Sequence, residues 1–136
     1  MDKFTEAYIV AALWSSTVDD PRYPTGSDNP GGEPMDKHYS IQDIAAETLA
    51  NMEADCKSFQ NRAAIAGIDF DDDIGKQTQC SPEEYAGHDF WLTRNHHGCG
   101  FWDGDWKEPA ATELTNLAHS FGECNLYVGD DGRICV

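Results

Sequence analysis

A stripe of apolar residues between positions 45 and 63 constrains the fold of this chain more than any other feature of its sequence. Its members follow one another at alternating steps of four and three residues: Ala45, Leu49, Met52, Cys56, Phe59 and Ala63. This spacing places them on one face of an α-helix. Ser40 can cap such a helix, Asp43 lies in its first turn, and Gly67 is a natural stop. We therefore predict a helix from about Ser40 to about Ala66.

Two further segments have helical spacing. Residues 3–17 contain two apolar stripes, which consist of Phe4, Ala7, Tyr8 and Ala11 and of Ile9, Ala12 and Leu13. An apolar face this wide predicts a well-buried helix. After Pro109, apolar residues recur at i, i+3, i+4 and i+7, namely Leu114, Leu117, Ala118 and Phe121. This pattern predicts a short helix that Gly122 ends.

Two segments indicate β-hairpins. Residues 88–94 alternate between two sets of side chains and are rich in strand formers, and residues 99–102 can return antiparallel after a turn at 95–98. Residues 125–128 and 133–136 flank the turn sequence Gly-Asp-Asp-Gly and predict a second hairpin. We therefore expect an α+β fold with two N-terminal helices and a small antiparallel sheet of two hairpins, with a short helix between the hairpins.

The length of 136 residues fits a single domain, 1–136. Four of the six prolines lie in a Pro/Gly-rich loop at about 19–39, and residues 67–86 are predicted to form an acidic loop. The chain has no apolar run near the roughly 18 residues of a membrane span and no signal-peptide pattern. Its five cysteines contain no C-x-x-C pair and suggest free thiols. We expect a cytoplasmic protein that does not enter membranes.

The net charge of −16 comes from 25 acidic and 9 basic residues, and the acid is spread along the whole chain. Such a field repels phosphate groups, so direct nucleic-acid binding is not expected. It attracts cationic surfaces, which makes a protein with a basic surface the expected partner. Two explanations stay open: the charge serves only solubility, or it imitates the negative surface of DNA.

The segment 87–106 combines groups of very different chemistry. It holds three of the four Trp, three of the five His, a Cys and three Asp. A metal site could draw on His88, His96, His97, Cys99, Asp103 and Asp105, although no H-x-H or H-E-x-x-H spacing is present. Cys99 could instead act as a nucleophile beside His96 or His97, but it lies between two glycines and has no evident oxyanion donor. We expect neither a metal nor a cofactor.

Partner recognition is the third interpretation of this segment. Aromatic residues and arginine dominate binding hot spots because they remove a large area from water at low entropic cost. We assign the predicted contact to five residues: Arg94, His96, Asp103, Asp105 and Trp106. Trp106 is the aromatic residue that we expect to be exposed, because charged residues flank it.

The sequence resembles a family of small acidic proteins encoded by bacteriophages and prophages. The resemblance is carried by residues 88–106, HDFWLTRNHHGCGFWDGDW, and by Leu13–Ser16, Gly31–Ala45 and Leu126–Ile134. The chain departs from the family pattern at His97 and Cys99, where smaller residues, Gly and Ala, are expected. Because His97 and Cys99 lie outside the pattern, the metal and thiol interpretations lose support.

The resemblance implies a phage-type accessory protein that binds a host or phage protein, and it carries no catalytic residue with it. One form of this function is inhibition of a host nucleic-acid-handling or defence protein, by occlusion or by DNA mimicry. Two alternatives remain. One is a small, metal-dependent hydrolase that uses the His/Asp/Cys group of residues 88–105, and the other is a structural phage protein. The oligomeric state is not predicted.

Overall fold

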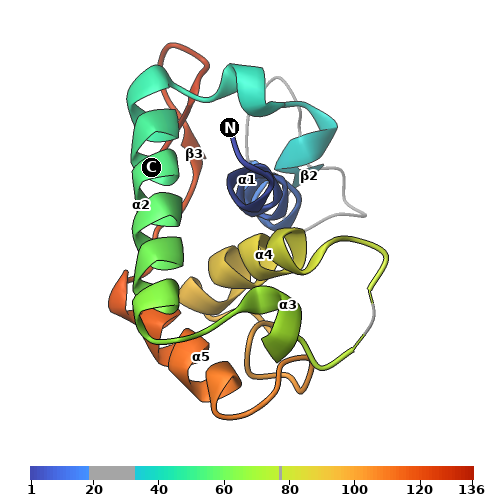
Figure 1. Ribbon diagram of the computed structural model, residues 1–136. Coiled ribbons are helices and arrows are strands. Elements are labelled where there is room, and N and C mark those ends of the chain that lie inside the picture. The colour runs from blue at the N-terminus through green and yellow to red at the C-terminus, as the bar shows by residue number, and fades with distance from the viewer. Residues whose placement is uncertain (19–32, 77) are drawn as a thin grey trace.

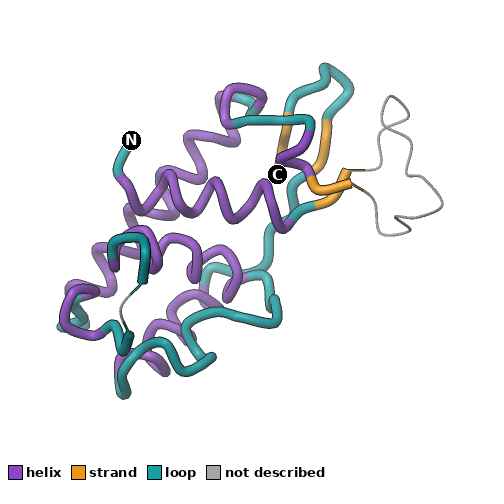
Figure 2. Tube along the Cα trace, turned by 90° about the vertical axis from the view of Figure 1, so that its right-hand side faces the viewer, coloured by secondary structure: helices purple, strands orange, loops and turns teal. Residues whose placement is uncertain are grey.

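The computed structural model describes residues 1–18, 33–76 and 78–136 (Figure 1). In chain order, its elements are α1 (Lys3–Ser15), β1 (Thr17–Val18), β2 (Glu33–Pro34), η1 (Met35–Lys37), η2 (Ile41–Asp43), α2 (Ala46–Ile65), α3 (Phe70–Asp73), α4 (Pro82–Arg94), α5 (Ala110–Ser120), β3 (Tyr127–Val128) and β4 (Ile134–Cys135). The strands form two antiparallel pairs, β1 with β2 and β3 with β4. Figure 2 shows both pairs gathered at one end of the helical body.

Helix α4 lies at the centre of the fold and is contacted by α1, α3 and α5. Its tightest neighbour is α1, which Figure 1 shows end-on beside it. The two helices approach at Gly87, where an added Cβ would lie 2.1 Å from the carbonyl oxygen of Phe4. Only a residue without a side chain permits this approach. The glycine therefore sets the distance between the two most extensively packed helices.

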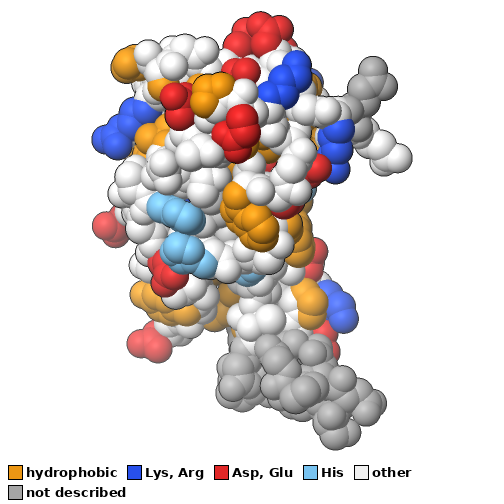
Figure 3. Space-filling model, turned by 90° about the horizontal axis from the view of Figure 1, so that it is seen from below, with side chains coloured by type: hydrophobic (Ala, Val, Ile, Leu, Met, Phe, Trp, Pro, Cys, Tyr) orange, Lys and Arg blue, Asp and Glu red, His pale blue; other side chains and the backbone are white. Residues whose placement is uncertain are grey.

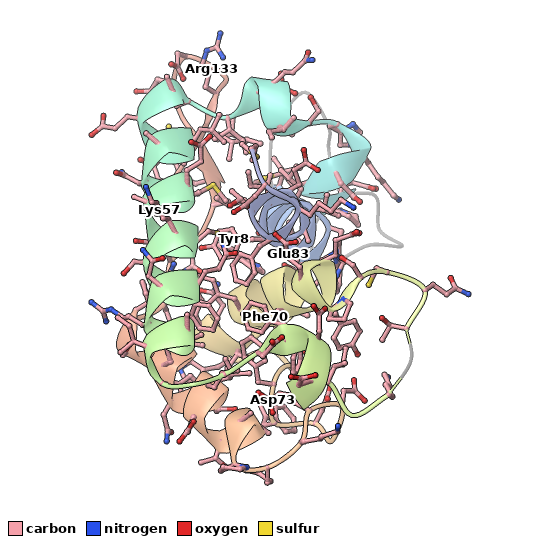
Figure 4. The ribbon with its side chains drawn as sticks, viewed as in Figure 1. Tyr8, Lys57, Phe70, Asp73, Glu83 and Arg133 are labelled. Carbon is pink, nitrogen blue, oxygen red and sulfur yellow. The ribbon has the colours of Figure 1, made fainter. Side chains whose placement is uncertain are left out.

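Aromatic side chains fill much of the core. All six phenylalanines belong to one network of ring contacts, in which Phe59 and Phe90 stack at 4.1 Å between centroids. Tyr8 and Phe70 point into the space among the helices in Figure 4. Burial of rings of this size contributes heavily to stability. Phenylalanines of this network lie on α1, α2, α3 and α4. Helix α5 contributes to the same core through Leu114 and the apolar residues around it.

Three predicted helices are present. The segment 3–17 forms α1, and the short helix after Pro109 is α5. The long stripe forms α2, with Met52, Cys56, Phe59 and Ala63 buried. The helix begins later than predicted, at Ala46, because Ser40 and Asp43 form a capping box around the short 3-10 helix η2 instead. The hairpin at 125–136 is also present, and the amide of Ala45 extends it by donating to the carbonyl of Ile134 over 2.9 Å.

The first predicted hairpin is wrong. Residues 88–94 belong to α4, and residues 99–105 form turns and bends rather than a returning strand. The helix starts where Ser81 accepts a hydrogen bond from the amide of Glu84, and Pro82 occupies its first turn. The mixed α+β character is retained, because helices are combined with small antiparallel sheets.

The two predicted loops have different outcomes. The acidic segment 67–86 contains α3 and the first residues of α4, so it is not a continuous loop. Of the Pro/Gly-rich segment 19–39, residues 33–37 form β2 and η1, whereas residues 19–32 lie outside the described part of the chain. Among the described helices, none combines the length and the apolar character needed to cross a bilayer.

Candidate functional site

Two acidic segments that are distant in sequence lie side by side at one end of the molecule. The amide of Gly75 donates to the carbonyl of Asp105 over 2.7 Å, and the amide of Lys107 donates to the carbonyl of Asp73 over 2.8 Å. Ile74 and Trp106 form an isolated antiparallel bridge between these bonds. The backbone of the 69–76 segment is thus fixed against the 103–108 segment.

We call the resulting surface the acidic end. Its carboxylates are those of Asp69, Asp71, Asp72, Asp73, Asp103, Asp105 and Glu108. All are exposed except Asp73 and Asp105, which are half-buried. Figure 4 shows Asp73 at α3, in the lower part of the molecule. Viewed from below, acidic side chains are interspersed with hydrophobic, histidine and basic side chains (Figure 3).

Two lysines partly offset this charge. Lys76 forms an ion pair of 3.0 Å with Asp105, and Lys107 donates to the backbone carbonyl of Asp72 over 2.8 Å. Asp105 also accepts a hydrogen bond from the hydroxyl of Tyr85. Burial acts to raise the pKa of Asp105, but the hydrogen bonds from Tyr85 and Lys76 outweigh it and the pKa is lowered. Asp105 is therefore a charged, well-fixed group.

Asp103 organises the loop that carries it. Its carboxylate accepts from the amide of Gly100 over 3.3 Å and from the amide of Asp105 over 3.4 Å. By contrast, among the described residues no hydrogen bond or ion pair reaches the carboxylates of Asp71 and Asp72. The carboxylates of these two side chains are therefore available to a partner.

Asp89 lies beneath the acidic end with only 5% of its surface exposed. It accepts a hydrogen bond of 2.7 Å from the indole N–H of Trp106. Burial, together with the nearby charges of Asp103 and Asp105, raises the pKa of Asp89 to about 7. A carboxyl group with this pKa changes charge near neutral pH. Its burial, however, keeps it away from any substrate.

Trp106 is buried, with 4% of its surface exposed, so the expectation that it is the exposed aromatic residue is wrong. The flanking charges point outward while the ring packs against Phe70 and Phe101 and donates to Asp89. The exposed aromatic residue of this segment is instead Trp102, which is 53% exposed.

Arg94 is also buried, at 4% exposure, and cannot contact a partner as predicted. Its guanidinium donates to Asp55 and to the hydroxyl of Tyr8, each over 2.9 Å. It also donates to the carbonyls of Phe121 and Gly122 over 3.0 Å and 2.9 Å. Arg94 thereby joins α4 to α1, to α2 and to the turn after α5. Its role is structural.

The structure separates the remaining groups of the central segment. His96 is exposed, stacks on His119 at 4.6 Å and lies 3.5 Å from Glu123. His97 lines a different surface, and Cys99 is exposed. Burial and then the charges of nearby aspartates raise the pKa of the Cys99 thiol, which disfavours the reactive thiolate. Within the described ranges, no group of three or more His, Cys, Asp or Glu side chains is placed to hold a metal ion.

Two hollows lined by described residues are open to the surface. One has a volume of about 130 Å³ and is lined by Trp102 and the outer side of α5. The other has a volume of about 350 Å³ and is lined by polar side chains together with Trp91 and Leu126: Ser15, Ser16, Thr17, Asn95, His97 and Asn125. Only the first adjoins the acidic end, because Glu108 belongs to both.

The sequence interpretation missed two features of the site. It placed the aspartates of residues 69–73 in an irregular loop, although Asp69 caps α3 by accepting from the amide of Asp71 over 2.9 Å. It also expected Trp106 rather than Trp102 to be the exposed aromatic residue, whereas Trp102 is the exposed one. The signal for the first was the Asp-Phe-Asp-Asp-Asp run itself, which is typical of a helix start.

Comparison of the chain with protein-family models, with curated proteins and with solved structures gave no match.

Proposed function

We propose that this protein acts by binding a partner protein with a basic surface, and that the acidic end makes the contact. One observation carries the proposal: backbone pairing holds residues 69–76 beside residues 103–108, so that two acidic segments carrying seven carboxylates lie together at one end of the molecule. Complementary charge accelerates association and selects against partners of like charge. The resemblance to phage-encoded acidic proteins makes a host or phage protein the proposed partner.

The form of action that fits this surface is occlusion of a nucleic-acid-binding groove. Carboxylates fixed on a rigid backbone can occupy the positions of phosphate groups, since Asp105 is held by Tyr85 and Lys76 and Asp103 by its own loop. The proposed partner is therefore a nucleic-acid-handling or defence protein that the bound chain inhibits. No described contact favours the hydrolase alternative, because His96, His97 and Cys99 face different surroundings.

Capture experiments with matched charge variants test this proposal. The immobilised protein is exposed to lysate of the bacterial host, and captured proteins are quantified by mass spectrometry with and without competing duplex DNA. The variant Asp71→Asn/Asp72→Asn removes two charges from the acidic end. The control Glu47→Gln/Glu53→Gln removes two exposed charges from α2.

We expect one or a few captured proteins to be displaced by DNA and by salt, since exposed charges are screened beyond about 10 Å at roughly 0.1 M ionic strength. The acidic-end variant should lose these proteins and the α2 control should retain them. Equal capture by both variants, or a complex that salt does not weaken, would contradict the proposal.

A further inference from the structure

A shallow groove runs between Trp102 and α5 at the edge of the acidic end. Its volume is about 130 Å³, and its walls are Trp102, Glu108, Ala111, Thr112, Thr115 and Asn116. The walls thus combine one aromatic face, one carboxylate, hydroxyl and amide groups, and a methyl floor. No cationic side chain is among these described walls. The chemistry of the groove suits a ligand that is positively charged and flat.

The aromatic wall is held by a fixed loop. The amide of Phe101 donates to the hydroxyl of Thr93 over 3.0 Å, and Asp103 accepts from Gly100. A Cβ added to Gly100 would lie 3.3 Å from the indole nitrogen of Trp102, so the ring packs closely over this glycine. Trp102 is nevertheless 53% exposed. Its exposure is therefore a consequence of a well-ordered loop and needs no rearrangement before binding.

The carboxylate wall is also fixed in position. Oε2 of Glu108 accepts from the amide and the hydroxyl of Thr112, over 3.3 Å and 2.8 Å. Among the described residues, none is hydrogen-bonded to the other oxygen, Oε1. The neighbouring Lys107 does not neutralise this group, because its ammonium donates to the carbonyl of Asp72. One oxygen therefore anchors the side chain and the other remains available to a cation.

We propose that this groove binds an arginine side chain of the basic partner, with its guanidinium between the Trp102 indole and the Glu108 carboxylate. Guanidinium is planar, stacks on aromatic faces and presents several N–H donors. The side-chain oxygens of Asn116 and of the threonines can accept hydrogen bonds from the guanidinium N–H groups that do not reach Glu108. A lysine ammonium is compact and strongly hydrated, and it gains less from such a surface. This inference rests on the proposed function and names the kind of residue that the partner contributes.

Two synthetic peptides of equal length and charge test the groove, one containing arginine and the other lysine at the same positions. Affinities are measured by isothermal titration calorimetry with the full-length protein. We expect the arginine peptide to bind roughly two- to fivefold more tightly, which is the range of an exposed cation–π contact. The variants Trp102→Ala and Glu108→Gln should abolish the preference. Trp102→Phe should keep part of it, and Trp14→Ala, which alters an exposed tryptophan outside the groove, should leave it unchanged.

The outcomes separate this inference from the proposed function. Equal binding of the two peptides, with no effect of Trp102→Ala, overturns the groove inference. The proposed function survives that result if Asp71→Asn/Asp72→Asn still weakens both peptides. Failure of both peptides to bind, together with capture that is insensitive to the acidic-end charges, overturns both.

Discussion

The indole N–H of Trp106 donates a hydrogen bond of 2.7 Å to the carboxyl group of Asp89, and both residues are almost completely buried. This bond joins the central helix α4 to the segment that carries the acidic end. It also fixes a titratable group beneath a surface that is already negative. Asp103 and Asp105 act on Asp89 from the loop, whereas Lys76 partly offsets them.

Stability should therefore depend on pH through Asp89. Its pKa is about 7 in the folded protein, against an ordinary value of 3.8, so the folded state holds this proton more tightly than the unfolded chain. The contribution of Asp89 to the free energy of unfolding is full below about pH 4 and is lost as the pH rises through about 7. We expect Asp89→Asn to remove this pH dependence of the free energy of unfolding. Above pH 7 the variant should be more stable than the wild type by roughly 2–4 kcal/mol.

Urea denaturation at a series of pH values measures this effect. Asp130→Asn makes the same substitution at an exposed position in the turn between β3 and β4, and it serves as the control. The prediction is contradicted if the free energy of unfolding depends on pH equally in the wild type and in Asp89→Asn. It is also contradicted if Asp89→Asn is less stable than the wild type at pH 8.

The contact between Gly87 and Phe4 predicts an unusually sensitive position on α4. A methyl group at Gly87 would collide with a backbone carbonyl, which cannot rotate away as a side chain can. We expect Gly87→Ala to lower the free energy of unfolding by about 3 kcal/mol or to prevent folding. Gly98→Ala is the matched control, because a Cβ there meets nothing within 4 Å. Its effect should stay within about 0.5 kcal/mol. Similar stabilities of the two variants would refute this account of the α1–α4 packing.

Arg94 should be required for folding rather than for binding. Arg94→Met removes the donors for Tyr8, Asp55 and two carbonyl groups, and we expect a loss of about 3–5 kcal/mol in urea denaturation. Arg94→Lys keeps the charge but loses the planar guanidinium group, so its stability should be intermediate. The exposed Arg133→Met is the control, since within the described part of the chain the Arg133 guanidinium donates only to the carbonyl of Gln42, over 3.4 Å. An Arg94→Met protein as stable as this control would contradict the structural role.

The sequence was sufficient to predict the elements that have one polar and one apolar face. Helix α2 shows this most clearly, because Met52, Cys56 and Phe59 are buried while Glu53 and Lys57 are exposed. Helix α4 has no such contrast. Its residues 89–94 are all buried, so the apolar periodicity of a helix is absent and the order of residue types imitates a strand. The start signal at Ser81 and Pro82 was the better guide.

The candidate site was harder to predict for a related reason. Whether a charged or aromatic side chain faces inward depends on the neighbours that folding brings to it, and those are distant in sequence. Trp106 is buried and donates its N–H to Asp89, whereas Trp102, four residues earlier, is half exposed. The acidic end depends in the same way on the pairing of Ile74 with Trp106.

The contrast between Trp102 and Trp106 can be measured directly by fluorescence quenching with acrylamide. Because Trp102 is half exposed, Trp102→Phe should reduce the accessible emission and leave the stability almost unchanged. Trp106→Phe should leave the accessible emission in place. It should also destabilise the fold by about 1–3 kcal/mol, because the buried carboxyl of Asp89 loses its donor. The same loss should raise the pKa of Asp89 further, since the Trp106 hydrogen bond acts to lower it. If Trp106→Phe instead removed the quenchable emission at no cost in stability, Trp106 would be the exposed ring and the arginine groove would lose its aromatic wall.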